Sequence, residues 1–209
     1  MKAIDKSEKG FASQAGFTLA ETLIVAAIIL VVAGLSIPSL SRTIDNTQLK
    51  SATQELAAVY QDARIRATQN NTSYEVLVSA PGVTPAQACI DLDGDGACGA
   101  GDPVTIFSNK IVVSNQGVPV PLGLQLTFPG VTDTEHSSMQ IPGLAWNSRG
   151  LPCQRSSAAA PCQATGWVQH LQFQRANGEI FYGAVTVAPT GRVKTWTYIS
   201  TGNGNGQWL

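Results

Sequence analysis

The sequence predicts an α+β fold, in which one long N-terminal helix packs on an antiparallel, β-rich head. Two observations predict it: residues 17–40 are almost wholly apolar, and short alternating segments separated by turns replace the helical spacing from residue 73 onward. The 209 residues, of which only 13% are charged, fit one ordinary domain that carries an unusually apolar segment. This composition excludes a coiled coil, a disordered tail protein and a polytopic membrane protein.

The apolar segment contains one charged residue, Glu21. A helix rises about 1.5 Å per residue, so about 20 residues cross a hydrocarbon core about 30 Å thick, and residues 17–40 are long enough for a single membrane span. Lys2, Lys6 and Lys9 precede the span. Because basic residues tend to stay in the cytoplasm, we expect a cytoplasmic N-terminus and a head on the other side of the membrane.

Beyond the span, apolar residues continue at gaps of mostly three or four, from Ile37 through Leu56 to Ala67. This spacing indicates one apolar stripe on an amphipathic helix. We therefore predict one helix from about Thr18 to Gln69, with Asn70-Asn71 ending it in the left-handed geometry that Asn tolerates.

The head is expected to contain about eight short antiparallel strands. Asn177-Gly178 is a type I′ hairpin signal, and Pro189-Thr190-Gly191 marks a further turn. The strands that the pattern favours are 74–78, 104–107, 111–113, 124–128, 171–174, 180–187 and 193–199.

The small residues Ala15-Gly16 precede the apolar segment, whereas a secretory signal is cut after its apolar core. An uncut N-terminal anchor is one interpretation. Glu21 argues against it, because a carboxylate within a span is costly in lipid and requires a partner. The span contains no Lys or Arg, so a second copy or a relative would have to bring the cation, for example as a free α-amino group.

The run Gly16-Phe17-Thr18-Leu19-Ala20-Glu21 resembles the class III signal peptide of type IV pilins and type II secretion pseudopilins. The resemblance implies that a prepilin peptidase cuts after Gly16 and that the new N-terminal Phe17 is N-methylated. It also implies that Glu21 pairs with the amine of a neighbouring subunit in the filament. Ala20 departs from the Ile or Val that the family more often has. The implied organisation is a cleaved leader at 1–16, a transmembrane half-helix at 17–40, an amphipathic half-helix at 41–72 and a head at 73–209.

Three further segments are similar to the GspH/FimT group of minor pseudopilins and minor pilins: 63–67, 146–150 and 190–194. A major pilin is the alternative, but it normally carries its cysteine pair near the C-terminus, whereas the last cysteine here is Cys162. The resemblance implies a minor subunit in the initiating or tip complex of a secretion pseudopilus or pilus, supporting protein secretion or pilus biogenesis. Its implied partners are other pilin or pseudopilin subunits, the prepilin peptidase and an inner-membrane assembly platform. Its implied location is the inner membrane, single-pass with a periplasmic head, and later the filament.

The four cysteines form two sequential pairs, Cys89 with Cys98 and Cys153 with Cys162, each enclosing eight residues. Outside the inner membrane disulfides persist, and among the three possible pairings we favour this one. Each bridge is worth about 2.7 kcal/mol in the chain-entropy model. A zinc site is disfavoured, because there is no C-x-x-C pair and neither His136 nor His170 has ligand-like spacing.

Between the first two cysteines, acids fall where a calcium loop requires them, at positions 1, 3, 5 and 12, with Gly96 at position 6. These acids are Asp91, Asp93, Asp95 and Asp102. Asp and Gly are also the commonest turn residues, and the expected helices do not flank the loop. A disulfide-closed turn is therefore favoured, with calcium as the one possible cofactor.

The sequence favours no catalytic function, because it has neither a P-loop nor a nucleophile with a recognisable base. Its net charge of −1 predicts no polyanionic partner. A DNA-binding minor pilin for natural transformation is nevertheless an alternative, since the FimT branch has a Gly-Arg-x-Arg motif associated with DNA. Here Arg192 and Lys194 occupy the matching places on one face of an expected strand, but Lys lacks the bidentate fork of Arg. A solvated hairpin is the other interpretation.

Overall fold

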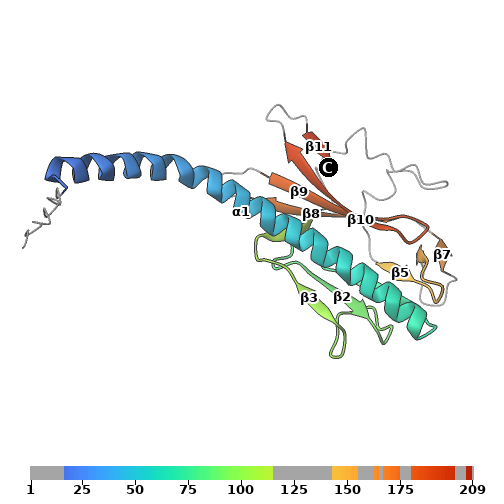
Figure 1. Cartoon of the computed structure of the whole chain (residues 1–209). Coiled ribbons are helices and arrows are strands. Elements are labelled where there is room, and N and C mark those ends of the chain that lie inside the picture. The colour runs from blue at the N-terminus through green and yellow to red at the C-terminus, as the bar shows by residue number, and fades with distance from the viewer. Residues whose placement is uncertain are drawn as a thin grey trace, which may run out of the picture. The chain divides into compact units, whose positions relative to one another are not determined.

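The computed structural model divides the chain into two compact units, residues 1–43 and residues 44–209. One helix, α1 (Leu19–Gln69), begins in the first unit and ends in the second (Figure 1). The residues that the structure describes are 17–114, 143–154, 162–164, 167–174, 180–200 and 206–208.

Both ends of α1 are capped by local sequence. The hydroxyl oxygen of Thr18 accepts a hydrogen bond from the backbone N–H of Glu21 at 3.2 Å, as an N-cap residue does. At the other end Asn71 has a φ of 50°, and the N–H of Thr72 donates to the carbonyl of Ala67 at 3.1 Å, which is a Schellman cap. The helix predicted from about residue 18 to residue 69 is therefore confirmed.

The second half of α1 carries a stripe of buried apolar side chains spaced three or four residues apart, which places them on one face of the helix. The stripe includes Leu49, Ala52, Leu56, Tyr60, Ala63 and Ala67. Residues between them, such as Glu55 and Gln61, are exposed. The buried face packs on two antiparallel sheets and forms one hydrophobic core with them.

The first sheet, sheet A, has the strand order β3-β2-β1-β5-β6-β7. Its strands are β1 (Tyr74–Val78), β2 (Gln87–Asp91), β3 (Val104–Ile106), β5 (Leu144–Trp146), β6 (Pro152–Gln154) and β7 (Gln163–Ala164). Val76 lies opposite both Ile90 and Leu144, and all three are buried in the core with the stripe of α1. This face of sheet A is therefore the one that contacts α1.

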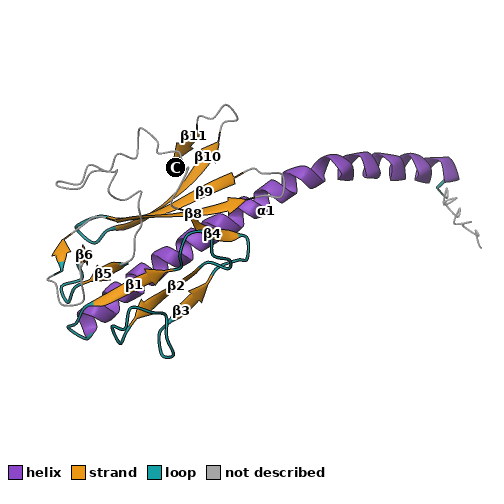
Figure 2. Cartoon of the chain, turned by 180° about the vertical axis from the view of Figure 1, so that it is seen from behind, coloured by secondary structure: helices purple, strands orange, loops and turns teal. Residues whose placement is uncertain are grey.

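The second sheet, sheet B, has the order β11-β10-β9-β8-β4. Its strands are β4 (Ile111–Ser114), β8 (Trp167–Gln174), β9 (Ile180–Val187), β10 (Val193–Ser200) and β11 (Gly206–Trp208). A Cβ on Gly183 would collide with the side chain of Thr53, so glycine allows β9 to approach α1 closely. Figures 1 and 2 show β2 and β3 along one flank of the second half of α1, with β9 and β10 along the other.

The predicted α+β class is confirmed, and β1 and β9 have their predicted bounds. β4 and β10 end one residue later than predicted, β3 ends one residue earlier, and β8 begins at Trp167 instead of 171. The predicted strand 124–128 and the turn Asn177-Gly178 lie outside the described residues, although β8 and β9 on either side of that turn pair as expected.

The estimate of about eight strands is wrong, because the described residues contain eleven. The unpredicted strands are β2, β5, β6, β7 and β11. Four of these have only two or three residues, too few to show alternation. β2 has five, but four of them are buried, since α1 covers one of its faces and a disulfide lies on the other, so no polar alternation survives.

Candidate functional site

The N-terminal segment presents Phe17 on the surface, where the residue is 77% exposed. Phe17 is not helical, and α1 begins two residues later at Leu19, with Thr18 as its cap. The bond at which we predict cleavage thus adjoins the start of a helix. Gly16, on the other side of that bond, lies outside the described residues.

Glu21 is exposed in the first turn of α1. Its backbone N–H is held by Thr18, through both the hydroxyl oxygen at 3.2 Å and the carbonyl oxygen at 3.1 Å. Its side-chain carboxylate takes no part in that cap and has no cationic partner among the described residues. The carboxylate is therefore available to a cation on another molecule.

Every residue of α1 from Leu19 to Gly34 is exposed, on all sides of the helix. The large apolar residues here are between 48% and 78% exposed: Leu19, Leu23, Ile24, Val25, Ile28, Ile29, Leu30, Val31 and Val32. Within the described residues, no helix combines the length and the apolarity that a membrane crossing requires. Exposed apolar surface on this scale marks a place where other molecules pack.

Residues 6–37 match the family model of the prokaryotic N-terminal methylation motif. The matched segment contains Gly16, Phe17 and Glu21. The match supports a type IV pilin or pseudopilin, and it implies a pilin-like subunit that a prepilin peptidase processes and that interacts with other pilin subunits. No curated protein and no solved structure matches the chain.

The three segments that resemble the GspH/FimT group, one in α1 and two in the head, meet at Arg64, in what we call the Arg64 corner. Arg64 Nη1 donates to the carbonyl of Gly191 at 3.0 Å, and its guanidinium carbon lies 5.6 Å from the ring centroid of Trp146. A Cβ on Gly150 would come within 3.1 Å of Arg64 Nε. One side chain of α1 therefore joins a turn of sheet A to a turn of sheet B.

Glycine is required at both turns of this corner. Gly150 and Gly191 have φ values of 71° and 83°, which other residues rarely adopt. A Cβ on Gly191 would also lie 2.9 Å from the carbonyl oxygen of Gly150. The corner thus brings together residues that lie in three separate segments of the sequence.

Arg192 and Lys194 are both exposed, with Arg192 just before β10 and Lys194 within it. The ammonium of Lys194 lies 3.4 Å from the ring centroid of Trp196, a cation–π contact. Arg149 is a third exposed cation that the sequence did not place with them. It precedes Gly150, whose carbonyl approaches Gly191, so the turns that carry Arg149 and Arg192 touch. DNA binding by Arg192 and Lys194 stays a prediction.

The structure contains both disulfides of the favoured pairing, Cys89–Cys98 and Cys153–Cys162, with Cα–Cα distances of 5.8 and 5.2 Å. Cys89 lies opposite Leu77, and Cys153 lies opposite Ala145. These positions alternate with the core residues of sheet A, so both cysteines are on the face away from α1. Each bridge therefore begins on that second face of sheet A.

The acidic loop brings together three of its four predicted calcium ligands. Carboxylate oxygens of Asp91, Asp93 and Asp95 lie within 4.8 Å of one another. Both oxygens of the buried Asp91 accept backbone N–H bonds, from Gly94 at 2.7 Å and Gly96 at 3.0 Å. These bonds close the turn by themselves.

Asp102, the fourth predicted ligand, is not in that cluster. Its two oxygens accept the N–H groups of Leu92 at 3.0 Å and Gly99 at 2.8 Å. Both hydrogen bonds, that from Leu92 first, hold the pKa of Asp102 below its ordinary value of 3.8. Asp102 thus ties the end of the loop to its beginning.

Proposed function

We propose that this chain is a minor subunit of the GspH/FimT kind in a type II secretion pseudopilus or a type IV pilus. Residues 17–40 hold the subunit in the inner membrane, with the N-terminus in the cytoplasm and the head in the periplasm, and later pack in the filament. The subunit joins the complex that starts the filament and stays at its tip, and it catalyses no reaction. The N-terminal match and the meeting of the three GspH/FimT-like segments at Arg64 support this proposal.

The observation that carries the proposal is the capped first part of α1, residues 19–34, which is exposed and apolar on all sides and whose one acid, Glu21, has no cation in the described residues. Processing after Gly16 would create an α-amino group at Phe17, four residues before Glu21. Between two subunits packed side by side, that amine and the Glu21 carboxylate can pair in surroundings of low dielectric, where unit charges attract strongly. The pair thereby selects the register of neighbouring helices.

The test replaces Glu21 by Gln, which removes the charge and keeps the Thr18 cap, because the cap uses the backbone N–H of Glu21. We expect Glu21→Gln to be processed and membrane-inserted but lost from sheared filaments or from the complex co-purified with other subunits. The matched control is Thr22→Ala, an exposed neighbour in the same turn, which should assemble normally.

Mass spectrometry of the membrane form provides the second readout. A mature N-terminus at Phe17 is the expected result, and a different N-terminus would contradict the pilin class. Normal incorporation of Glu21→Gln would instead contradict only the charge-pair mechanism.

A further inference from the structure

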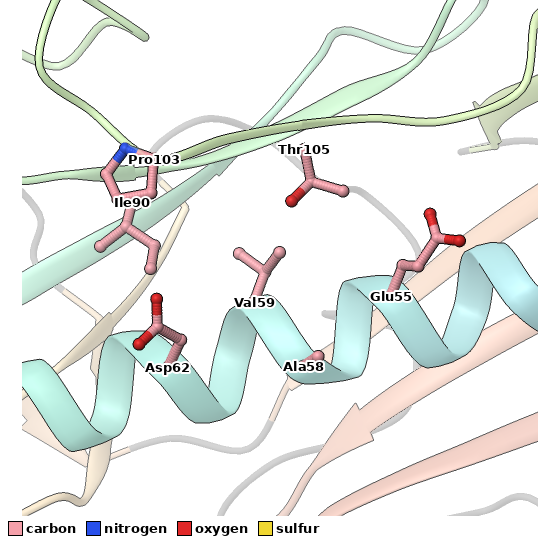
Figure 3. Close-up of a pocket in the computed structure, with 7 residues that line it drawn as sticks. All are labelled: Glu55, Ala58, Val59, Asp62, Ile90, Pro103 and Thr105. Carbon is pink, nitrogen blue, oxygen red and sulfur yellow. The ribbon is translucent and has the colours of Figure 1, made fainter.

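A groove with acidic side chains lies between the second half of α1 and β3, the last strand at one edge of sheet A (Figure 3). Its volume is about 270 Å³, and we call it the acidic groove. Figure 3 shows Asp62 at the end of the groove near Pro103 and Glu55 at the end near Thr105, with Val59 between the two acids. The groove is therefore an apolar slot with a carboxylate at each end.

Both carboxylates of the groove are accessible to a cation. Glu55 accepts a hydrogen bond from the Ser51 hydroxyl at 3.0 Å and has no cationic partner in the described part of the chain. Asp62 pairs with Arg66 at 2.9 Å, but the two side chains are 38% and 44% exposed, and such surface pairs contribute little. The segment 81–103, which leads into β3, adds four acids and no base. The charge around the groove therefore favours a basic partner.

The main chain of β3 has free hydrogen-bonding groups along its outer edge. On the β2 side, the carbonyl of Pro103 accepts a hydrogen bond at 3.2 Å, and the N–H of Phe107 donates one at 2.9 Å. In an antiparallel ladder every second residue bonds to the same neighbour. The N–H and C=O groups of Val104 and Ile106 therefore point away from β2, and no strand of the described residues pairs with them.

The side chains of β3 alternate between the two faces of sheet A. Thr105 faces α1 and lines the groove. Val104 lies opposite Cys89, on the face away from α1, and Ile106, two residues further on, shares that face. These two side chains are 42% and 63% exposed, and an edge strand with exposed apolar side chains is a place where another chain associates.

We propose that the β3 edge binds an extended segment of another protein, with basic residues alternating with apolar ones, as an additional antiparallel strand of sheet A. The main chain of that segment bonds to Val104 and Ile106, as in other cases of recognition by strand addition. Its apolar side chains pack beside these two residues, and its basic side chains, on the other face, reach Glu55 and Asp62.

The spacing of the two acids suits such a segment. Glu55 and Asp62 are seven residues apart, about 10.5 Å along α1, and alternate residues of a strand are about 7 Å apart. The long, flexible side chains of two such basic residues span the difference. The site lies within the unit of residues 44–209, so the proposal goes beyond the proposed function and does not rest on it.

The test measures binding of a synthetic peptide to the full chain in a non-ionic detergent. The probe is the fluorescein-labelled peptide Gly-Ser-Lys-Val-Arg-Val-Lys-Ser, whose fluorescence anisotropy should rise to saturation as the chain is added. The affinity should fall with added salt, because exposed charge pairs are screened. A peptide of the same composition with its basic residues in one block, Gly-Ser-Lys-Arg-Lys-Val-Val-Ser, should lose most of the binding.

Methylated peptides test whether the main chain of the probe pairs with β3. In an antiparallel pairing the valines lie opposite Val104 and Ile106 and donate their N–H groups to β3. A probe methylated on the two valine nitrogens should therefore lose its binding. The matched control is methylated on two of the basic residues' nitrogens, which point away from β3, and it should bind as the parent peptide does.

Charge variants of the chain test the two acids of the groove. Glu55→Gln and Asp62→Asn should each weaken binding about two- to fivefold, the range of an exposed charge pair. The matched control is Gln61→Lys, which changes the net charge by the same single unit as Glu55→Gln. Gln61 is exposed on α1 and does not line the groove, so this variant should bind the probe with unchanged affinity.

A proline variant tests the edge from the side of the chain. Ile106→Pro removes an N–H that points away from β2, a position at which an edge strand tolerates proline, and it should abolish binding. Ile106→Ala keeps that N–H and should retain binding. The methylated peptides make the same test without altering the chain, so the result does not depend on the folding of Ile106→Pro.

Four results would overturn the proposal: no saturable binding, equal binding of the two methylated peptides, equal affinity of Glu55→Gln and the wild type, or an unliganded oligomer that Ile106→Pro makes monomeric. The last result would assign the β3 edge to a second copy of the chain. None of these measurements involves the N-terminal segment, so processing at Phe17 and assembly through Glu21 are tested separately.

Discussion

The two halves of α1 belong to one continuous helix, but their apolar side chains differ in burial. In the first half the large apolar side chains, such as Ile29 at 61%, are exposed in every direction. In the second half the apolar residues form one stripe, with Leu56 and Tyr60 at 0% exposure. The difference shows that the angular spread of apolar residues, and not their number, indicates what covers a helix. An apolar stripe indicates that the chain's own sheets cover the helix, whereas apolar residues on all sides indicate that a membrane or other subunits cover it.

The largest effect on stability should come from truncating a large apolar residue in the second half of α1, with the same truncation in the first half as its control. Leu56→Ala removes a fully buried side chain and should lower the free energy of unfolding by about 2–5 kcal/mol. Ile29→Ala should leave it unchanged, because that side chain contacts no core. Denaturant unfolding of the full chain in detergent, followed by tryptophan fluorescence, gives both values. Equal losses would mean that the first half of α1 also contributes to the stability of the head.

The turn at Gly191 contacts Arg64 of α1, and a comparison of two glycines can test how much this contact contributes to stability. Gly82 and Gly191 both have positive φ, 79° and 83°, but a Cβ on Gly82 meets nothing within 4 Å. Gly82→Ala should therefore cost only the backbone strain, about 1–2 kcal/mol. Gly191→Ala should cost more, because its Cβ would also press on Gly150 and Arg64. If the two costs are equal in thermal unfolding, the Arg64 corner is loosely packed.

A smaller, pH-dependent effect should appear in the acidic loop of the head. The native pKa of Asp102 lies below 3.8, so its contribution to stability is complete above that pH and is lost as the pH falls through the native pKa. Asp102→Asn should be less stable than the wild type at pH 7, and the difference should shrink below pH 3.8. Melting temperatures across this range measure it. A constant difference would mean that the carboxylate charge is not what holds the loop.

The smallest effect is expected from calcium. Because Asp91 and Asp102 already accept backbone N–H bonds with both oxygens, we expect equal melting temperatures in millimolar calcium and in chelator. A ligand that binds only the native state would raise the melting temperature. A rise that Asp93→Asn abolishes would assign a calcium site to the loop after all.

The sequence predicted those elements whose ends are set by neighbouring residues, such as helix caps and turns. The ends of α1 follow from Thr18 and Asn71, whose own side chain or φ makes the cap. Long strands such as β9 were found because their apolar runs end at turn residues. The spacing of the acids did not predict that Asp102 lies outside the cluster of Asp91, Asp93 and Asp95, because spacing alone does not specify which way a carboxylate turns.

Other features depend on contacts that no local pattern contains. Arg64 and Gly191 are 127 positions apart, so the sequence shows two separate motifs where the structure has one corner. β2 was missed because its two faces are covered by different parts of the chain, which removes the alternation that identifies a strand. A groove lined by Glu55 and Asp62 of α1, Ile90 of β2 and Thr105 of β3 (Figure 3) is likewise formed by residues that only the fold brings together.

The close packing of the buried half of α1 has a mechanical consequence within the unit of residues 44–209. A force along this half of the helix acts against side chains that interlock between α1 and the sheets, including the close approach of Thr53 to Gly183. Such loading shears many contacts at once instead of peeling strands one by one. The buried half of α1 is thus held in a way that resists its extraction from the head.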